Sequence, residues 1–188
     1  FWCSDNTDPY ERIYIQWSLS KFFPAKTMGS HVTNWNKNTS VKFRTDVCSS
    51  CKLGFDIDLK SFSAGDYKFV QQAVKNYDNM KPMILEGDLY RLVSPYEGNH
   101  CAINYVSKDK QRAVLFAYDL HPRYKEPLQN VKLQGLDAKK MYTVKETNLM
   151  PGKDSELEYN GKQYSGDYLM KIGLNVFTAQ DGTSHVLV

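Results

Sequence analysis

The segment FWCSDNTDPYER, residues 1–12, decides how the first half of the chain is expected to fold. Its first three residues form an apolar run, and the polar stretch that follows contains Asp5. A helix start comes next, because Asp8 fits the N-cap, Pro9 the first helical position and Glu11 the place of a capping-box acid. The segment therefore predicts a short strand, a polar loop that carries Asp5, and a helix.

The alternation of strand and helix continues to about residue 87. We expect the first helix to end at Pro24, because proline cannot donate to the helical hydrogen-bond ladder. The apolar pattern then predicts, in order, a strand over 27–33, a polar loop over 34–38, a helix over 41–50, a strand over 53–59 and a helix over 63–86. Pro82 is expected to kink the last helix or divide it in two. This stretch holds too few strands to close an eight-stranded barrel, and would supply roughly three of its eight βα units.

The second half changes character near residue 88. Strand-like segments follow one another at 90–93, 100–106, 113–120, 131–133, 141–145 and 184–188. Short strands joined by turns are typical of an antiparallel sandwich. We therefore predict an α/β region over residues 1–87 and an all-β domain over residues 88–188.

Composition excludes several classes of function. The 24 Lys and Arg against 21 Asp and Glu leave a net charge of only +3, spread too evenly to indicate nucleic-acid binding. No run approaches the ~18 apolar residues of a membrane span. Cys48 and Cys51 have CxxC spacing, but no second pair stands at zinc-ligand spacing, so we expect reduced thiols and no metal or cofactor. No signal peptide is visible. The location of the complete protein is left open, with the cytoplasm expected rather than secretion.

Several motifs, in order along the chain, resemble those of glycoside hydrolase family 36, a family of α-galactosidases. Residues 2–8, WCSDNTD, are similar to the family's W-x-S-D-N-T-D, which precedes a helix with an early arginine such as Arg12. The other matching segments are MGSHV at 28–32, GDLYRL at 87–92, SPYEGN at 94–99, GLD at 135–137 and YSGDYLM at 164–170. The resemblance covers nearly the whole chain.

This resemblance implies a fold and an activity. Residues 1–87 would be the C-terminal portion of a (β/α)8 TIM barrel, and residues 88–188 a C-terminal antiparallel β-sandwich. The implied enzyme is a retaining α-galactosidase that hydrolyses terminal α-linked galactose from oligosaccharides such as raffinose or melibiose, and that forms a homo-oligomer when complete. The family's K-W-D-M-N-R motif, which carries the nucleophile, is not found in this sequence. We therefore expect a fragment that is inactive alone.

Asp5 and Asp8 compete for the role of catalytic acid/base. Asp8 has a sufficient structural role as a helix cap, whereas Asp5 follows the strand, where a barrel has its active-site face. The resemblance also places the acid/base at Asp5. Weaker candidates for substrate contact are Trp2, as a stacking platform, and Met28 with Gly29, where glycine would let a substrate approach. Barrel-core packing explains Trp2 and a turn explains Gly29 nearly as well.

Most other polar residues singled out in the first half are expected to have structural roles. His31 is expected to be a hydrogen-bonded structural histidine, and Asp56 and Asp58 are expected to be structural, while Trp35 in the polar loop is a possible sugar platform. Two other functions stay open. One is a non-catalytic carbohydrate-binding or assembly module, for which the SDNTD segment at a strand end would have no use, and the other is a relative that transfers galactose to another sugar.

Overall fold

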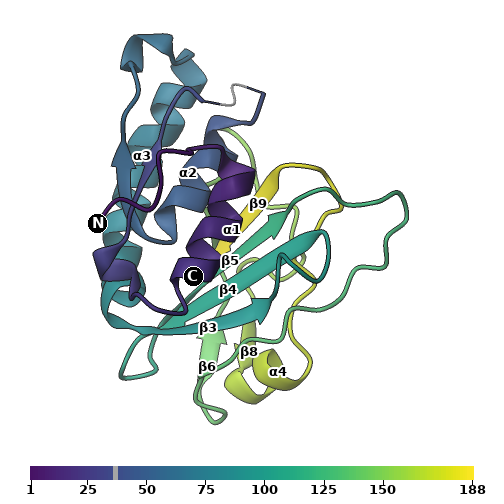
Figure 1. Ribbon diagram of the computed structural model, residues 1–188. Coiled ribbons are helices and arrows are strands. Elements are labelled where there is room, and N and C mark those ends of the chain that lie inside the picture. Colours follow the sequence, from purple (N-terminus) through teal and green to yellow (C-terminus); the bar gives the residue numbers. More distant parts are fainter. Residues whose placement is uncertain (36–37) are drawn as a thin grey trace.

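The structure is a computed structural model that describes residues 1–35 and 38–188. The predicted loop over 34–38 therefore lies partly outside the described residues, at Asn36 and Lys37. Figure 1 shows a layer of helices from the first half lying against a sheet from the second half.

Helices and two short parallel strands make up the first half. Its elements are α1 (Pro9–Leu19), β1 (Gly29–Val32), α2 (Val41–Ser49), β2 (Lys52–Phe55), α3 (Ala64–Glu86) and two 3-10 turns, Ala25–Thr27 and Leu59–Ser61. β1 and β2 pair in parallel, and Trp2 forms a parallel bridge to Gly29 on the other side of β1. The predicted helix over 41–50 is confirmed.

Two predicted elements of the first half are too long. α1 ends at Leu19 rather than at Pro24, because the carbonyl of Ser20 accepts a hydrogen bond of 2.7 Å from Arg91 instead of one from a further helical turn. The strand predicted over 53–59 ends at Phe55. The chain turns there because Asp58 caps the following 3-10 turn through the amide of Lys60.

α3 is one continuous helix, so Pro82 does not divide it, while the alternative of a kink stays a prediction. Pro82 lies on the exposed side of the helix, where water can replace the hydrogen bond that proline cannot make. On the other side, Met80, Met83 and Ile84 are buried in the core on either side of the proline. Packing of the buried face holds the helix together across this position.

The second half is built on a five-stranded antiparallel sheet. Its strands are β3 (Asp88–Val93), β4 (His100–Val106), β5 (Ala113–Asp119), β7 (Glu146–Thr147) and β9 (Thr183–Leu187), in the spatial order β3-β4-β5-β9-β7. A separate pair is formed by β6 (Met141–Thr143) and β8 (Gln163–Ser165), and α4 (Gly166–Lys171) follows. The strand predicted over 131–133 is reduced to a single bridge from Val131 to Leu174, and α4 was not predicted.

Alternate residues of β5 serve two cores. Val114, Phe116 and Tyr118 pack with α1, α2 and α3, while Leu115 and Ala117 face a second cluster on the opposite side of the sheet. This second cluster also contains Leu133, Leu136, Leu169 and Leu174. Because side chains alternate along a strand, one central strand binds the helical layer to the rest of the second half.

Candidate functional site

Three segments of the first half end at the same edge and carry polar residues there. The backbone amide of Cys3 donates to the carbonyl of Gly29 over 3.1 Å, which aligns residues 1–3 with β1, and β1 is in turn parallel to β2. Thr33 and Asp56 directly follow β1 and β2, and Asp5 lies two residues after the 1–3 segment. Since the carboxyl ends of parallel strands meet at one edge, the three polar side chains are brought to the same face.

A hollow of about 370 Å³ lies at this edge, and its lining contains aromatic and polar side chains. The lining residues are Trp2, Asp5, Thr7, Thr33, Trp35 and Asp56. Thr7 and Thr33 are joined through their hydroxyls over 2.6 Å, so the loop after residue 5 is tied to the end of β1. The structure thus brings together Trp2, Asp5 and Trp35, and adds Asp56, which the sequence interpretation took as structural.

Asp56 could have been found from the signal that pointed to Asp5. It comes directly after the last residue of β2, at the carboxyl end of a parallel strand. The alternation of Asp56 and Asp58 with the apolar Phe55 and Ile57 was interpreted instead as a sign of structural side chains. Asp58 does have a structural role, because it caps the 3-10 turn.

The two competing carboxylates have different surroundings. Asp8 caps α1, as predicted, and accepts from the backbone amides of Tyr10 at 2.9 Å and Glu11 at 3.3 Å. The side chain of Asp5 is exposed to the hollow and accepts no hydrogen bond from any residue that the structure describes. Only Asp5 keeps both oxygens open to a ligand.

The buried guanidinium of Arg12 holds the loop on both sides of Asp5. Its Nη2 donates to the carbonyl of Ser4 over 2.6 Å and its Nε donates to the carbonyl of Asn6 over 2.7 Å. Ser30 at the start of β1 lies 3.4 Å from Nη1, and its hydroxyl donates to Gln16 over 2.6 Å. A rigid fork that binds the two flanking carbonyls fixes the backbone direction of Asp5.

Trp2 stacks on His31 next to the hollow. The two ring centroids are 3.7 Å apart and the ring planes differ by 15°. A side chain at Gly54 would bring its Cβ within 2.5 Å of the His31 ring, so glycine at that position lets the imidazole lie flat under Trp2. Burial and the nearby charge of Arg12 lower the pKa of His31. His31 is therefore neutral at pH 7, and supports Trp2.

Met28 and Gly29 do not line the hollow. The Met28 side chain is only 1% exposed and packs inside the helical layer. Gly29 contributes its backbone, which exchanges hydrogen bonds with Phe1 and Cys3. The structure thus separates these two residues from Asp5 and Trp2, which share the hollow.

The four cysteines are free, and three of them are buried. Burial raises the pKa of Cys48 to about 11, so this thiol carries its proton at neutral pH. Within residues 1–35 and 38–188 there is no group of three His, Cys, Asp or Glu side chains that could hold a metal ion. In the same part of the chain, no helix has the length and hydropathy to span a bilayer.

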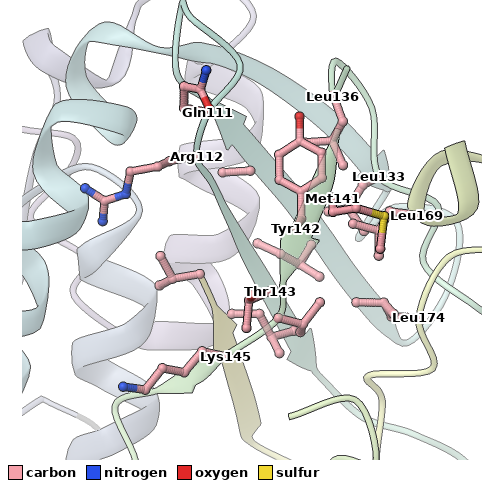
Figure 2. Close-up of a pocket in the computed structure, with 15 residues that line it drawn as sticks. Gln111, Arg112, Leu133, Leu136, Met141, Tyr142, Thr143, Lys145, Leu169 and Leu174 are labelled. Atoms are coloured by element: carbon pink, nitrogen blue, oxygen red, sulfur yellow. The ribbon is translucent and has the colours of Figure 1, made fainter. Parts of the chain in front are cut away.

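A different hollow, of about 360 Å³, lies in the second half between the five-stranded sheet and the β6–β8 pair. Figure 2 shows Leu133, Leu136, Leu169 and Leu174 on one side of it, with Met141 and Tyr142 at the same end. Its described lining includes no carboxylate. This hollow therefore lacks the carboxyl group that glycoside hydrolysis uses, whereas the Asp5 hollow provides one.

Comparison with known proteins gives matches over both halves. The family model described as Melibiase matches residues 1–87, and the model described as Glycosyl hydrolase family 36 C-terminal domain matches residues 100–188. Alpha-galactosidase AgaA from Geobacillus stearothermophilus is 31% identical over 165 residues, which are 85% of this chain and 22% of that protein. Alpha-galactosidase 1 from Pediococcus pentosaceus is 32% identical over 179 residues, covering 91% of this chain and 24% of that protein.

Solved structures give the same result. The crystal structure of an AgaA variant from Geobacillus stearothermophilus in complex with raffinose has a TM-score of 0.83 and 27% identity, over 98% of this chain and 24% of that chain. Another variant, in complex with stachyose, has a TM-score of 0.83 and 28% identity over the same shares. The chain spans about a quarter of the length of these proteins. Its motifs, both matched family models and its fold show that this chain belongs to glycoside hydrolase family 36, the family of the α-galactosidases that it resembles.

Proposed function

We propose that Asp5 is the general acid/base of a retaining α-galactosidase, of which this chain supplies one part. The observation that carries the proposal is the open carboxylate of Asp5 in a hollow with two tryptophans. The relatives named α-galactosidase, and the related structures with raffinose and stachyose, support an α-linked galactoside as the substrate.

The proposed chemistry needs a second carboxylate as the nucleophile, and the family motif that carries it is not found in this sequence. A retaining glycosidase uses two carboxyl groups about 5–5.5 Å apart, one of which attacks the anomeric carbon. Asp5, protonated at first, would give its proton to the departing glycosidic oxygen as that bond breaks. Asp5, then ionised, would take a proton from the water that releases galactose from the nucleophile. The complete reaction therefore needs both groups, and we propose that this chain alone is inactive.

The proposed architecture follows from the arrangement of the two halves. Residues 1–87 would form the last three βα units of a (β/α)8 barrel, supported by the parallel alignment of residues 1–3, β1 and β2. Residues 88–188 would form the C-terminal β-sandwich, supported by the five-stranded antiparallel sheet and the β6–β8 pair. We also propose a homo-oligomeric complete enzyme. The exposed aromatic rings of Phe1, Phe22 and Phe23 support contact with further polypeptide.

Trp2 is proposed as a platform for the galactose ring, since it is 49% exposed beside Asp5 and its other face is held by His31. Trp35, which follows the carboxyl end of β1 and lines the same hollow, is proposed as a second contact with the substrate. Gly29 would act through its backbone, by holding residues 1–3 in place. Met28 would support the same strand from the buried side.

The test uses the complete enzyme and compares Asp5→Asn with Asp8→Asn. An aryl galactoside with a good leaving group needs little protonation, so Asp5→Asn should impair its first step far less than that of raffinose. Release of the glycosyl-enzyme should then slow, and azide, which needs no general base, should restore turnover as α-galactosyl azide. Loss of one proton-transfer catalyst is expected to lower raffinose hydrolysis by about 10²–10⁴-fold.

Asp8→Asn is the matched control, because asparagine also caps helices and should leave both substrates nearly unaffected. If Asp8→Asn gave the azide-rescued pattern and Asp5→Asn did not, the assignment of the acid/base would be wrong.

A further inference from the structure

We infer that Thr33 is a positioning residue, which holds Trp35 against the leaving-group sugar of an oligosaccharide substrate; this rests on the proposed acid/base role of Asp5. Thr33 directly follows β1, and it lines the Asp5 hollow together with Trp35. Its hydroxyl and its carbonyl bind different segments of the first half. One residue therefore connects the loop that carries Asp5, the loop that carries Trp35 and helix α2.

Hydrogen bonds from three segments meet at Thr33. Its hydroxyl lies 2.6 Å from the hydroxyl of Thr7, and accepts from the backbone amide of Trp35 over 3.1 Å. Its carbonyl accepts from Nη1 of Arg44 in α2 over 2.6 Å. A hydroxyl has one proton and two electron pairs, so the contacts with Thr7 and Trp35 can exist at the same time.

The segments that hold Thr33 are buried, whereas the residue that Thr33 holds is open. Thr7 and Arg44 are each 7% exposed, so their contacts with Thr33 are largely shielded from water. The side chain of Trp35 is 61% exposed. An aromatic ring that is open to solvent, on a backbone that is already fixed, can receive a ligand with little loss of conformational freedom.

The connection through Thr33 places Asp5 between the two tryptophans of the hollow. Trp2 precedes Asp5 by three residues. Trp35 is joined to the other side of the loop, at Thr7, through the hydroxyl of Thr33. The acid/base of a glycosidase gives its proton to the oxygen between the galactose ring and the leaving group. With galactose on Trp2, Trp35 is left for the departing sugar.

The charge of the hollow favours a neutral leaving group that is rich in hydroxyls. Of the described lining residues, only Asp5 and Asp56 have ionisable side chains, and both are acids. An anionic group would be repelled there, whereas sugar hydroxyls can donate to a carboxylate. The indole of Trp35 can pack against the C–H face of a pyranose. The hollow of about 370 Å³ is within the range of roughly 300–1,000 Å³ that small-molecule sites occupy.

The test compares two substrates of the complete enzyme, raffinose and α-galactosyl fluoride. The leaving group of raffinose is sucrose, whereas fluoride is a single atom with no surface to place on Trp35. Thr33→Val removes the hydroxyl, so kcat/KM for raffinose should fall about tenfold, through a higher KM. For the fluoride, kcat/KM should change by less than about twofold. Thr33→Ser keeps the hydroxyl and should restore most of the activity towards raffinose.

Thr143→Val is the matched control, since the exposed hydroxyl of Thr143 also accepts one hydrogen bond, from Gln163 at 3.2 Å, but lies in the second half. It should leave the selectivity between the two substrates unchanged. Folding is checked in the isolated ¹⁵N-labelled chain. There, Thr33→Val should shift the indole signal of Trp35 and leave that of the buried Trp17 in place.

A second variant tests the same inference without altering Thr33. Trp35→Leu removes the ring but keeps the hydrogen bonds of Thr33, and should give the same selective loss with raffinose. The inference is overturned if Thr33→Val or Trp35→Leu affects both substrates equally, or neither. It is also overturned if Thr33→Ser is as impaired as Thr33→Val. Failure of the proposed function has a different signature, because it appears as a lack of azide rescue in Asp5→Asn.

Discussion

Two aspartates of the first half, Asp5 in its loop and Asp46 at the contact between α2 and β9, have opposite surroundings. Asp46 of α2 is completely buried and accepts from Lys42 at 2.5 Å, Asn148 at 2.7 Å and Ser184 at 2.7 Å. Asp5 is exposed and accepts from none of the described residues. An aspartate whose two oxygens both accept buried hydrogen bonds holds structure. One whose backbone is fixed while its oxygens stay open is available for chemistry.

The contact around Asp46 also joins the two halves of the chain. Ser184 belongs to β9, and Asn148 follows β7, so one side chain of the first half binds two distant segments of the second. Lys42 adds a hydrogen bond of 2.8 Å to the carbonyl of Ser184. We call this cluster of Lys42, Asp46, Asn148 and Ser184 the α2–β9 cluster. Asn76 extends it, because its side-chain amide donates to Oδ1 of Asn148 over 2.9 Å.

The largest effect should come from removing the carboxylate at the centre of the α2–β9 cluster. Asp46→Ala leaves Lys42, Asn148 and Ser184 without their acceptor in a buried place, and should lower the free energy of unfolding by about 3–5 kcal/mol. The matched change Asp5→Ala should alter it by less than about 0.5 kcal/mol. Urea unfolding followed by tryptophan fluorescence measures both. Equal losses in the two variants would remove the contrast between the two aspartates.

A smaller and pH-dependent effect is expected at Glu146. Burial opposes its charge, but hydrogen bonds from His185 at 2.6 Å and from Ser155 outweigh it, and the pKa of Glu146 lies below its ordinary value. Its contribution to stability is therefore complete above the unfolded pKa of about 4.3 and is lost as the pH falls through the lower, folded value. Glu146→Gln should cost about 1.5–3 kcal/mol at neutral pH.

The check is a series of urea midpoints between neutral pH and acid. The unaltered chain should lose more stability below the unfolded pKa than Glu146→Gln does. If the urea midpoints of the two proteins fell in parallel with pH, the Glu146–His185 pair would not contribute to the loss of stability in acid.

The smallest effects concern two tyrosine hydroxyls that bind across the halves. Tyr105 of β4 is buried and donates to the carbonyl of Ser50 over 2.8 Å, whereas Tyr96 is exposed and shares a 2.8 Å contact with the Ser18 hydroxyl. Tyr105→Phe should cost about 1 kcal/mol, and Tyr96→Phe less than about 0.5 kcal/mol. Thermal unfolding of both variants measures the difference. A larger cost for Tyr96→Phe would mean that the exposed contact holds the halves more strongly than burial suggests.

Much of the fold could be predicted because local signals and tertiary structure agree. The Asp8 cap, helix 41–49 and the strands around residues 100–106 and 113–119 follow from capping residues and from periods of 3.6 and 2. α4 and β7 were missed because six residues and two residues are too short to show a period. The continuity of α3 at Pro82 could not be predicted, because the burial of the neighbouring residues that holds the helix together is not a local signal.

The candidate site could be predicted only in part, for a related reason. Asp5 and Trp2 follow from a strand end and from family motifs. The hold of Arg12 on the carbonyls of Ser4 and Asn6 depends on where α1 lies relative to the loop. The support of Trp2 by His31 requires the absence of a side chain at Gly54, on a different strand. Such contacts join residues far apart in sequence, so they cannot be predicted from a periodic sequence pattern.

The place of β9 in the sheet sets the order in which the protein can assemble during synthesis. β9 is translated after all the other described strands, yet it lies between β5 and β7 and supplies all the ladder pairing that the described residues give β7. A nascent chain that has passed Asp119 can pair β3, β4 and β5, but β5 keeps an open edge until residues 183–187 emerge. Until then, Asp46 also lacks Ser184. An open edge invites pairing with other chains, so this interval is when the growing polypeptide most needs shielding.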